Sequence, residues 1–223
     1  MEKRYDNVYI KRFIYFNLYV IKGEDGDILI DTGFIGMKRR LKKWLDQFNI
    51  KLVILTHAHV DHVWNTSYIK KLYNCDVAIG IDDVENIDNS KIKSSPISER
   101  YVRWTKLMNW GMRKFVAPKF DVDFVLEDEQ IVSKYGIDLK ILSLTGHTNG
   151  SIGILYKDYL FAGDSLVNRR KQPSVAHQNQ NNEKALKTQE KIVNLNPRII
   201  FVGHDKEFVL TNEVKNDLLC SIQ

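Results

Sequence analysis

The stretch Thr56-His57-Ala58-His59-Val60-Asp61-His62 directly follows the apolar run Lys51 to Leu55 and holds four candidate metal ligands. The run predicts a buried strand, so the ligands stand on the loop that leaves it. A single histidine there would be an ordinary core or surface residue. Burying the whole cluster without a metal would leave polar groups unpaired, at a cost of about 1 to 3 kcal/mol each. The spacing lets His57 and His59 face one ion while Asp61 and His62 address a second, and these donors suit zinc.

Three further apolar segments end in a glycine that precedes a residue of ligand type. They are Ile141 to Thr145 before Gly146-His147, Tyr159 to Ala162 before Gly163-Asp164, and Ile199 to Val202 before Gly203-His204. Glycine lets the backbone turn sharply or approach an ion closely. Strand ends gathered at one edge of a sheet would bring these residues together, and that edge is a usual place for an active site.

Asp31 follows another strand signal, Ile28 to Ile30, and precedes Thr32-Gly33. Taken alone, it has the pattern of an ordinary turn residue. Beside the other candidates, it is also suited to accept a hydrogen bond from a ligating histidine. Both interpretations stay open at the level of the sequence.

Strand and helix patterns alternate in both halves of the chain. Strands are predicted at Val8 to Ile10, Phe13 to Ile21, Ile28 to Ile30, Lys51 to Leu55, Val77 to Ile81, Asp123 to Leu126, Leu139 to Leu144, Gly153 to Tyr156, Tyr159 to Phe161 and Ile199 to Val202. Helices are predicted at Met37 to Phe48, Val63 to Leu72, Ser98 to Phe115 and Glu183 to Leu195. The first strands form an antiparallel meander, and the strand and helix order after it implies parallel pairing. Two sheets packed face to face, with helices outside, would satisfy both halves.

Composition sets the broad class. The chain has 223 residues, 43% hydrophobic and 27% charged, which is typical of a globular protein, and we expect one domain over 1–223 with a helical insertion at about 82–120. No run of about 18 apolar residues exists and the opening residues are polar, so we expect a cytoplasmic protein without a membrane partner. Cys75 and Cys220 form no thiolate zinc motif. The net charge of +5 is spread over many lysines, which disfavours nucleic acid as a partner.

The expected insertion carries apolar residues at helical spacing, namely Tyr101, Trp104, Met108, Met112 and Phe115. This spacing favours a stripe that faces the core. In a second interpretation, Trp104, Trp110 or Arg113 lines a substrate pocket. An exposed aromatic stripe could also form the contact of a homodimer.

Four residues near the motifs are further candidates for contact with a small-molecule substrate: Trp64, Arg169, Arg170 and His177. Trp64 either packs against the sheet or stacks on the substrate. Arg169 and Arg170 form an exposed basic turn or anchor a carboxylate or phosphate. His177 is a solvated loop residue or a substrate contact, since its polar stretch follows Asp164.

Taken in chain order, Asp31, His57-x-His59-x-Asp61-His62, His147, Asp164 and His204 resemble the motifs of the metallo-β-lactamase fold superfamily, over most of the chain from Ile28 to Asp205. The resemblance implies an α+β fold, the four-layered αββα sandwich of two mixed β-sheets flanked by helices. It also implies two metal ions in each chain. By this resemblance one ion is held by His57, His59 and His147, the other by Asp61, His62 and His204, with Asp164 bridging.

The activity implied by this resemblance is hydrolysis at a dinuclear zinc site, with iron or manganese as alternative metals. A hydroxide held between the two ions would attack an ester, thioester, lactone or similar bond. Asp61 would be the catalytic residue that accepts or delivers a proton.

Comparison with particular branches narrows the expected substrate. β-Lactams are disfavoured, because some β-lactamases use a Cys ligand or lack the bridging aspartate present here. The ligand set resembles that of glyoxalase II, but we expect too little chain after His204 for its helical substrate-binding domain. It also resembles that of quorum-quenching lactonases, which usually carry a Tyr where this chain has Val167.

Two alternatives from other classes remain. An iron-dependent oxidoreductase, such as a sulfur dioxygenase or a flavodiiron protein, shares this scaffold, although flavodiiron proteins usually have Glu in place of His59. A nuclease or phosphodiesterase would need basic clusters that the segment Asp82 to Phe120 lacks.

Overall fold

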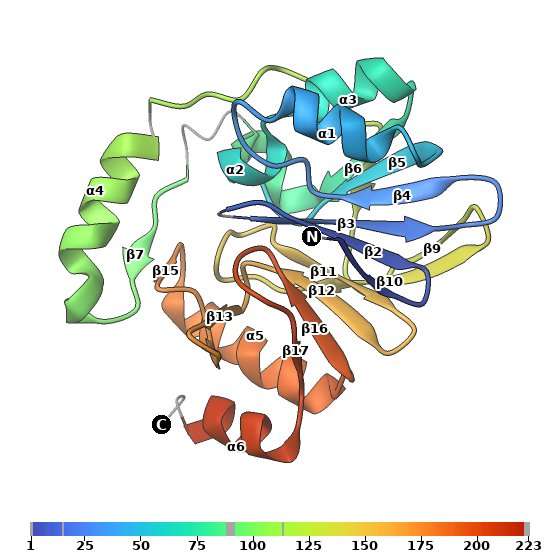
Figure 1. The fold of residues 1–223 in the computed structure, drawn as a ribbon. Coiled ribbons are helices and arrows are strands. Elements are labelled where there is room, and N and C mark those ends of the chain that lie inside the picture. The colour runs from blue at the N-terminus through green and yellow to red at the C-terminus, as the bar shows by residue number, and fades with distance from the viewer. Residues whose placement is uncertain (1, 15, 88–91, 113, 221–223) are drawn as a thin grey trace.

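Two β-sheets face each other in the computed structural model, which describes residues 2–14, 16–87, 92–112 and 114–220 (Figure 1). Within these residues, the first sheet has the strand order β1-β2-β3-β4-β5-β6-β8 and the second has the order β17-β16-β12-β11-β10-β9. The strands of the first sheet are β1 (Glu2–Tyr5), β2 (Val8–Arg12), β3 (Asn17–Lys22), β4 (Asp27–Ile30), β5 (Ile50–Leu55), β6 (Asp76–Gly80) and β8 (Phe124–Leu126). Those of the second are β9 (Ile131–Lys134), β10 (Ile137–Ser143), β11 (Ile152–Tyr156), β12 (Tyr159–Gly163), β16 (Ile199–Val202) and β17 (Phe208–Val209).

Strand pairing in the first sheet changes direction at β4. Strands β1 to β4 pair antiparallel, and β4, β5, β6 and β8 then pair in parallel. Helix α1 (Lys38–Leu45) connects β4 to β5, while α2 (Val60–Val63) and α3 (Thr66–Tyr73) connect β5 to β6. The predicted meander and parallel pairing are therefore confirmed. Strand β3 begins later than predicted, because the Phe13 N–H donates to the Phe16 carbonyl (2.9 Å) and closes a turn.

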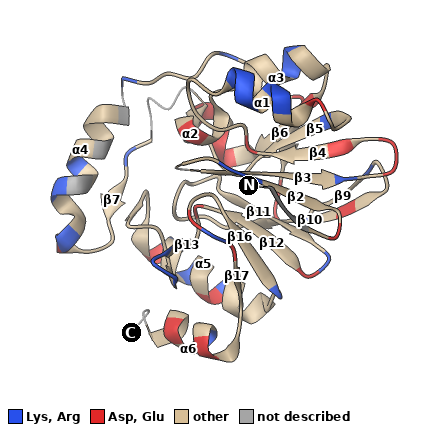
Figure 2. Cartoon of the chain, in the orientation of Figure 1, with Lys and Arg blue, Asp and Glu red and all other residues tan. Residues whose placement is uncertain are grey.

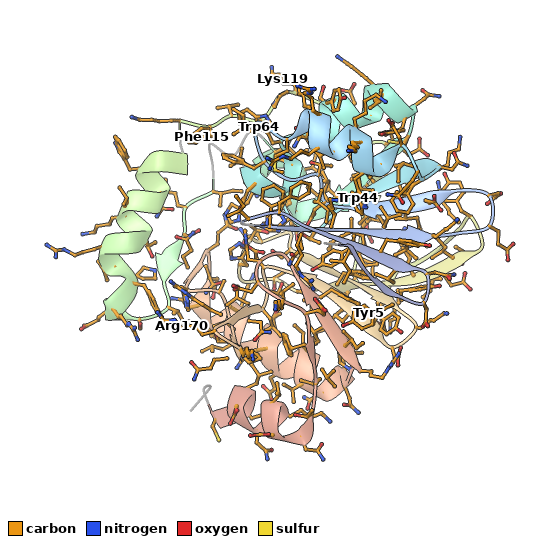
Figure 3. All side chains as sticks on the ribbon, in the orientation of Figure 1. Tyr5, Trp44, Trp64, Phe115, Lys119 and Arg170 are labelled. Carbon is orange, nitrogen blue, oxygen red and sulfur yellow. The ribbon has the colours of Figure 1, made fainter. Side chains whose placement is uncertain are left out.

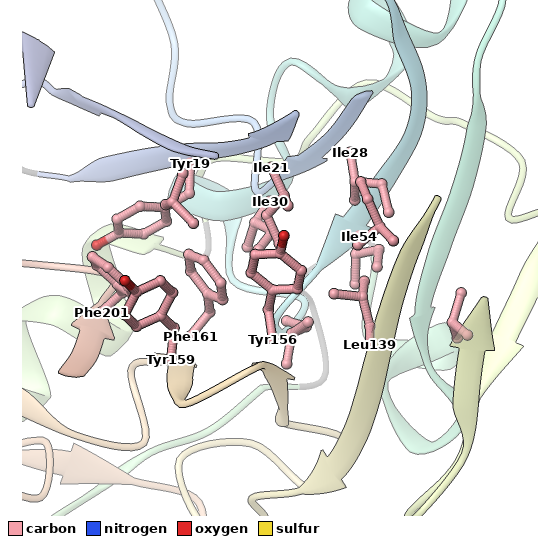
Figure 4. Close-up of a cluster of buried hydrophobic side chains, with 14 of the residues drawn as sticks. Tyr19, Ile21, Ile28, Ile30, Ile54, Leu139, Tyr156, Tyr159, Phe161 and Phe201 are labelled. Atoms are coloured by element: carbon pink, nitrogen blue, oxygen red, sulfur yellow. The ribbon is translucent and has the colours of Figure 1, made fainter. Parts of the chain in front are cut away.

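The space between the sheets is filled by aliphatic and aromatic side chains. Figure 4 shows Ile28 and Ile54 of the first sheet above Leu139 of the second. Tyr19 meets Phe161 edge to face, with ring centroids 5.2 Å apart. Each such side chain contributes about 1.5 to 3 kcal/mol by leaving water, so this layer holds the two sheets together.

Helices cover the outer faces of both sheets. Leu41 and Trp44 of α1 and Ile69 of α3 are buried in a cluster with residues of the first sheet. Two helices, α5 (Asn182–Leu195) and α6 (Asn212–Cys220), lie against the second sheet and bury Ile192 and Leu218. The order helix, sheet, sheet, helix confirms the predicted α+β class and the four-layered αββα sandwich. No described helix combines the length and the apolar character that a membrane span requires.

The expected insertion forms an arm at the side of the sandwich. It contains β7 (Ser95–Pro96) and α4 (Val102–Met112), together with the short 3-10 helices η1 (Ile81–Asn86) and η2 (Glu99–Tyr101). In Figure 1, α4 stands apart from both sheets. None of its described side chains belongs to a buried cluster, and Leu107 and Trp110 are 58% and 62% exposed. Neither residue belongs to the predicted core-facing stripe, and the side chains of its members Trp104, Met108 and Met112 lie outside the described ones, so the stripe stays a prediction.

Strand pairing ties this arm to the chain beyond Asp164. A hairpin of β13 (Val167–Arg169) and β14 (Gln172–Ser174) leads to β15 (Gln178–Asn179), which pairs antiparallel with β7. The Asn182 side chain adds a hydrogen bond to the Pro96 carbonyl (2.8 Å). The arm is thus held beside the loop that contains His177.

Candidate metal centre

The loops that leave β5, β10, β12 and β16 carry the candidate ligands. His57 and His59 follow β5, His147 follows β10, and Asp164 and His204 follow the parallel neighbours β12 and β16. Asp61 and His62 lie in α2, the short helix that begins next to His59. The structure therefore brings all seven predicted ligands together from segments far apart in the sequence.

Three histidines form the inner part of the cluster. The ligand atoms of His57, His59 and His147 lie within 4.8 Å of one another, and all three residues are buried. His59 Nδ1 and His147 Nε2 are 2.9 Å apart. Three neutral imidazoles at this separation could hold one metal ion.

Asp61, His62 and His204 form the outer part of the cluster. Their ligand atoms also lie within 4.8 Å of one another, and His204 Nε2 is 3.4 Å from Asp61 Oδ2. The side chains of Asp61 and His204 are 28% and 27% exposed, whereas that of His62 is 1% exposed. The open side of the cluster is therefore the side of Asp61 and His204.

Asp164 lies between the two trios. Its Oδ2 is 3.0 Å from His204 Nε2 and 3.6 Å from His147 Nε2, and its Oδ1 is 3.5 Å from His62 Nε2. With His57 and His62 it forms a third group with metal-ligand spacing. One carboxylate thus contacts members of both trios.

The buried polar atoms of the cluster fit a metal. His57 Nε2, His62 Nε2 and Asp164 Oδ1 are buried and form no hydrogen bond with any residue that the structure describes. Orphaned buried polar atoms are costly, and imidazole and carboxylate groups are common metal donors. A side chain at Gly203 would collide with Asp164 Oδ1, so glycine keeps this space open. The residues present therefore suit metal ions.

Asp31 lies behind His62 and fixes its ring. Its Oδ2 is 2.8 Å from His62 Nδ1, and its carboxylate also accepts hydrogen bonds from the backbone N–H (2.8 Å) and hydroxyl (2.9 Å) of Thr56. Its backbone φ of +60° is in the left-handed region, which is uncommon for a residue other than glycine. The contact with His62 directs Nε2 of that ring toward Asp164.

Asp83 is a supporting residue that the sequence patterns missed. This fully buried carboxylate accepts hydrogen bonds from the Ala58 N–H (2.8 Å), the Thr148 hydroxyl (2.7 Å) and the Gly150 N–H (3.1 Å). It therefore joins the loop of His57 and His59 to the loop of His147. Asp82-Asp83 has the pattern of a surface turn, and no local signal distinguishes the buried member.

Burial and neighbouring charges divide the histidines into two electrostatic groups. Burial lowers the pKa of His57 and His147, and burial together with His147 lowers the pKa of His59 to about 3. Burial opposes protonation of His62 as well, but Asp31 and Asp164 raise its pKa to about 10. The inner trio is thus neutral and ready to bind a cation, whereas His62 carries a proton that a metal must displace.

The predicted substrate residues occupy different places around this cluster. Trp64 is half-buried and meets Phe34 and Phe115 edge to face, with centroids 5.5 and 6.3 Å apart (Figure 3). Arg169 and Arg170 are exposed on the β13–β14 hairpin. His177 stacks on the Tyr101 ring, with centroids 4.2 Å apart. Arg113 lies outside the described residues, and contact with a substrate stays a prediction for all of them.

The αββα sandwich carries a cluster of histidines and aspartates at its rim. Together they define the class of protein, a four-layered sandwich with a candidate metal-binding site. The chain belongs to the metallo-beta-lactamase superfamily, whose family model matches residues 16–204. The residues that carry the resemblance in the sequence all fall within this match, so the predicted superfamily is confirmed.

Curated relatives point to the same class. A probable metallo-hydrolase of Methanocaldococcus jannaschii is 31% identical over 67% of this chain and 66% of its own length. The human acyl-coenzyme A thioesterase MBLAC2 is 27% identical over 66% of this chain and 57% of its own length. The chain thus spans less than two thirds of the length of either relative.

Solved structures share the fold. A metallo-beta-lactamase family protein from Thermus thermophilus superposes with a TM-score of 0.73 at 19% identity, covering 97% of this chain and 79% of that one. BJP-1, a subclass B3 metallo-beta-lactamase of Bradyrhizobium japonicum, gives a TM-score of 0.67 at 22% identity, covering 91% of this chain and 76% of its own. At these identities the likeness extends to the fold alone.

Proposed function

We propose that this protein is a hydrolase with two zinc ions that cleaves an ester or thioester of an apolar acyl group. His57, His59 and His147 would hold one ion, Asp61, His62 and His204 the other, and Asp164 would contact both. The observation that carries the proposal is the set of three overlapping ligand groups whose buried atoms His57 Nε2, His62 Nε2 and Asp164 Oδ1 have no hydrogen-bond partner among the described residues. Zinc ions bound there would activate water and polarise the scissile carbonyl group.

Asp61 is the residue that we assign to proton transfer. Burial opposes its ionisation, but His62 and His204 hold the pKa of its carboxyl well below the usual range. It is therefore a carboxylate at neutral pH, on the open side of the cluster, where it can accept a proton from the attacking water. The same group can return the proton to the departing alcohol or thiol.

An aromatic wall beside the open side of the cluster favours a substrate with an apolar acyl group. Trp64 lies three residues after Asp61, about one helical turn away, and with Phe34 and Phe115 it forms a three-ring cluster. Phe115 remains 38% exposed, so the cluster has an apolar surface still open to solvent. Apolar and aromatic linings are typical of small-molecule sites. The human relative, an acyl-coenzyme A thioesterase by name, favours the thioester among the candidate bonds.

Metal analysis and a substrate panel test the proposal. Purified protein should contain two zinc ions per chain and hydrolyse acyl thioesters or esters in preference to lactones, phosphodiesters and β-lactams. His59→Ala and Asp164→Ala should lose metal and hydrolysis, whereas His177→Ala, a histidine outside the cluster, should keep its metal. Iron with oxygen consumption would show the oxidoreductase alternative instead, and full activity in both alanine variants would overturn the ligand assignment.

A further inference from the structure

A groove of about 420 Å³ lies between α1 and the end of β2. The lining residues are Lys11, Arg12, Phe13, Ile14, Arg40, Lys43 and Trp44. Four of them are cations, and none of these described lining residues is acidic. Figure 2 shows the Lys and Arg residues gathered on α1. The groove is therefore a positively charged concave surface, separate from the candidate metal centre.

Two cations at its rim have no opposing charge. Arg40 and Lys43 lie three residues apart on one face of α1, both are exposed, and neither forms an ion pair with a described residue. Their neighbour Lys42 differs, because it pairs with Asp46 at 2.6 Å. Arg40 and Lys43 thus bring two cations without a described ion-pair partner to the groove.

The walls of the groove contain two donors that folding leaves unpaired. Arg12 Nε and Trp44 Nε1 are buried and have no hydrogen-bond acceptor in the part of the chain that the structure describes. The other end of the Arg12 guanidinium donates to Glu207, so its orientation is fixed. A buried donor without an acceptor destabilises the fold, and a ligand that brings acceptors removes this cost.

Apolar side chains complete the groove. Ile14 is 84% exposed at its edge, and Phe13 is half-buried against Phe16, with ring centroids 5.2 Å apart. Inorganic phosphate would leave this surface unused. A ligand that joins an anionic group to an apolar or aromatic one would contact both the cations and the apolar side chains of the groove.

We propose that this groove binds the phosphate group of an organic phosphate ester. A phosphate carries up to two charges and three acceptor oxygens, so it can satisfy several guanidinium and ammonium donors at once. A carboxylate offers one charge and two oxygens, a poorer match to Arg40 and Lys43, the two lining cations for which no ion pair with a described residue is seen, beside the Arg12 guanidinium that Glu207 already holds. The adjoining apolar residues contact the organic part of the ester.

The groove adjoins the metal centre through two paired strand ends. Arg12 is opposite Asn17 in the β2–β3 pair, and the Asn17 N–H donates to the Gly203 carbonyl (2.8 Å), next to His204. The phosphate could therefore belong to the far end of the substrate, an assignment that rests on the proposed function. It could equally belong to a separate small molecule that binds beside the site.

Calorimetric titration of the chelator-treated, metal-free protein tests the groove without involving the metals. AMP should bind, inorganic phosphate should bind more weakly, and adenosine should not bind. Arg40→Gln and Lys43→Gln should each weaken AMP binding roughly tenfold. Arg39→Gln, which removes the same charge from the same helix outside the groove, should bind AMP like the unaltered protein. Adenosine binding as tight as that of AMP, or equal weakening in all three variants, would overturn the proposal.

Kinetics with the zinc-loaded protein distinguish the two sources of phosphate. If the phosphate belongs to the substrate, Arg40→Gln raises KM for a phosphate-bearing thioester more than KM for a neutral one, and AMP competes only with the former. If it belongs to a separate ligand, AMP binds without competing with either thioester. Retained AMP binding in a protein that hydrolyses no thioester would contradict the proposed function and leave the groove assignment standing.

Discussion

The Asp83 carboxylate lies 2.8 Å from the backbone nitrogen of Ala58, the residue between His57 and His59. The same oxygen accepts a hydrogen bond from the Thr148 hydroxyl (2.7 Å), next to His147. One buried acceptor therefore sets the spacing between the two loops that carry the inner trio. This support comes from a residue that is not itself a candidate ligand.

Replacing this acceptor tests its role. In Asp83→Asn, an amide N–H₂ replaces one carboxylate oxygen and must face donors, which should cost roughly 1 to 3 kcal/mol of unfolding free energy and weaken binding at the inner trio. Thermal unfolding and zinc titration would measure both effects. The exposed neighbour variant Asp82→Asn should change neither, and an Asp83→Asn protein with unaltered zinc affinity would refute the positioning role.

Asp31 should control the affinity of the outer trio. Asp31→Asn removes the charge that accepts from His62 Nδ1 and leaves the ring free to adopt the other tautomer. Changes to such supporting groups typically reduce metal affinity about 10- to 100-fold. Competition with a chromogenic chelator measures this loss, with exposed Asp25→Asn as the matched control. Equal affinity in the two variants would show that Asp31 is only a turn residue.

Zinc affinity should rise with pH. The pKa of His62 is raised to about 10, and that of His204 also lies well above its usual value, because Asp164 and neighbouring carboxylates outweigh burial. Both rings are therefore protonated in the metal-free protein at neutral pH, and zinc must displace the protons. Calorimetry in buffers of different ionisation enthalpy should detect proton release on binding.

The same protons affect the stability of the metal-free protein. A raised pKa in the folded state stabilises it below the unfolded pKa, and this contribution is lost as pH rises through the folded value. The gap in unfolding temperature between zinc-loaded and metal-free protein should therefore widen from about pH 6 to about pH 9. A gap that narrows over this range would contradict the assigned protonation.

The Phe115 ring should increase the preference of the enzyme for thioesters with long acyl chains. Phe115→Ala removes one ring of the three-ring wall and should raise KM for long-chain thioesters several-fold more than KM for short-chain ones, because less apolar surface is buried on binding. Trp110→Ala, which changes an exposed aromatic residue on α4, is the control. If both variants alter chain-length preference equally, the wall is not the acyl site.

Local patterns predicted most of the regular elements. The helix predicted at Glu183 to Leu195 is α5, and the strands predicted at Gly153 to Tyr156 and Tyr159 to Phe161 correspond to β11 and β12. Short pairings such as β7 with β15 escaped prediction, because two-residue strands have no measurable period. What the α4 stripe packs against stays a prediction, because helical spacing shows only that residues share a face of the helix.

The sequence by itself determined which side chains could serve as metal ligands, because imidazoles and carboxylates placed after apolar strands form a recognisable chemical pattern. Only the tertiary structure decided that Asp164 lies between the two trios, that Asp83 joins the two loops of the inner trio, and that Arg12 and Trp44 share a groove with Arg40. Those relationships connect residues distant along the chain. They depend on strand pairing and packing, which no local window of sequence contains.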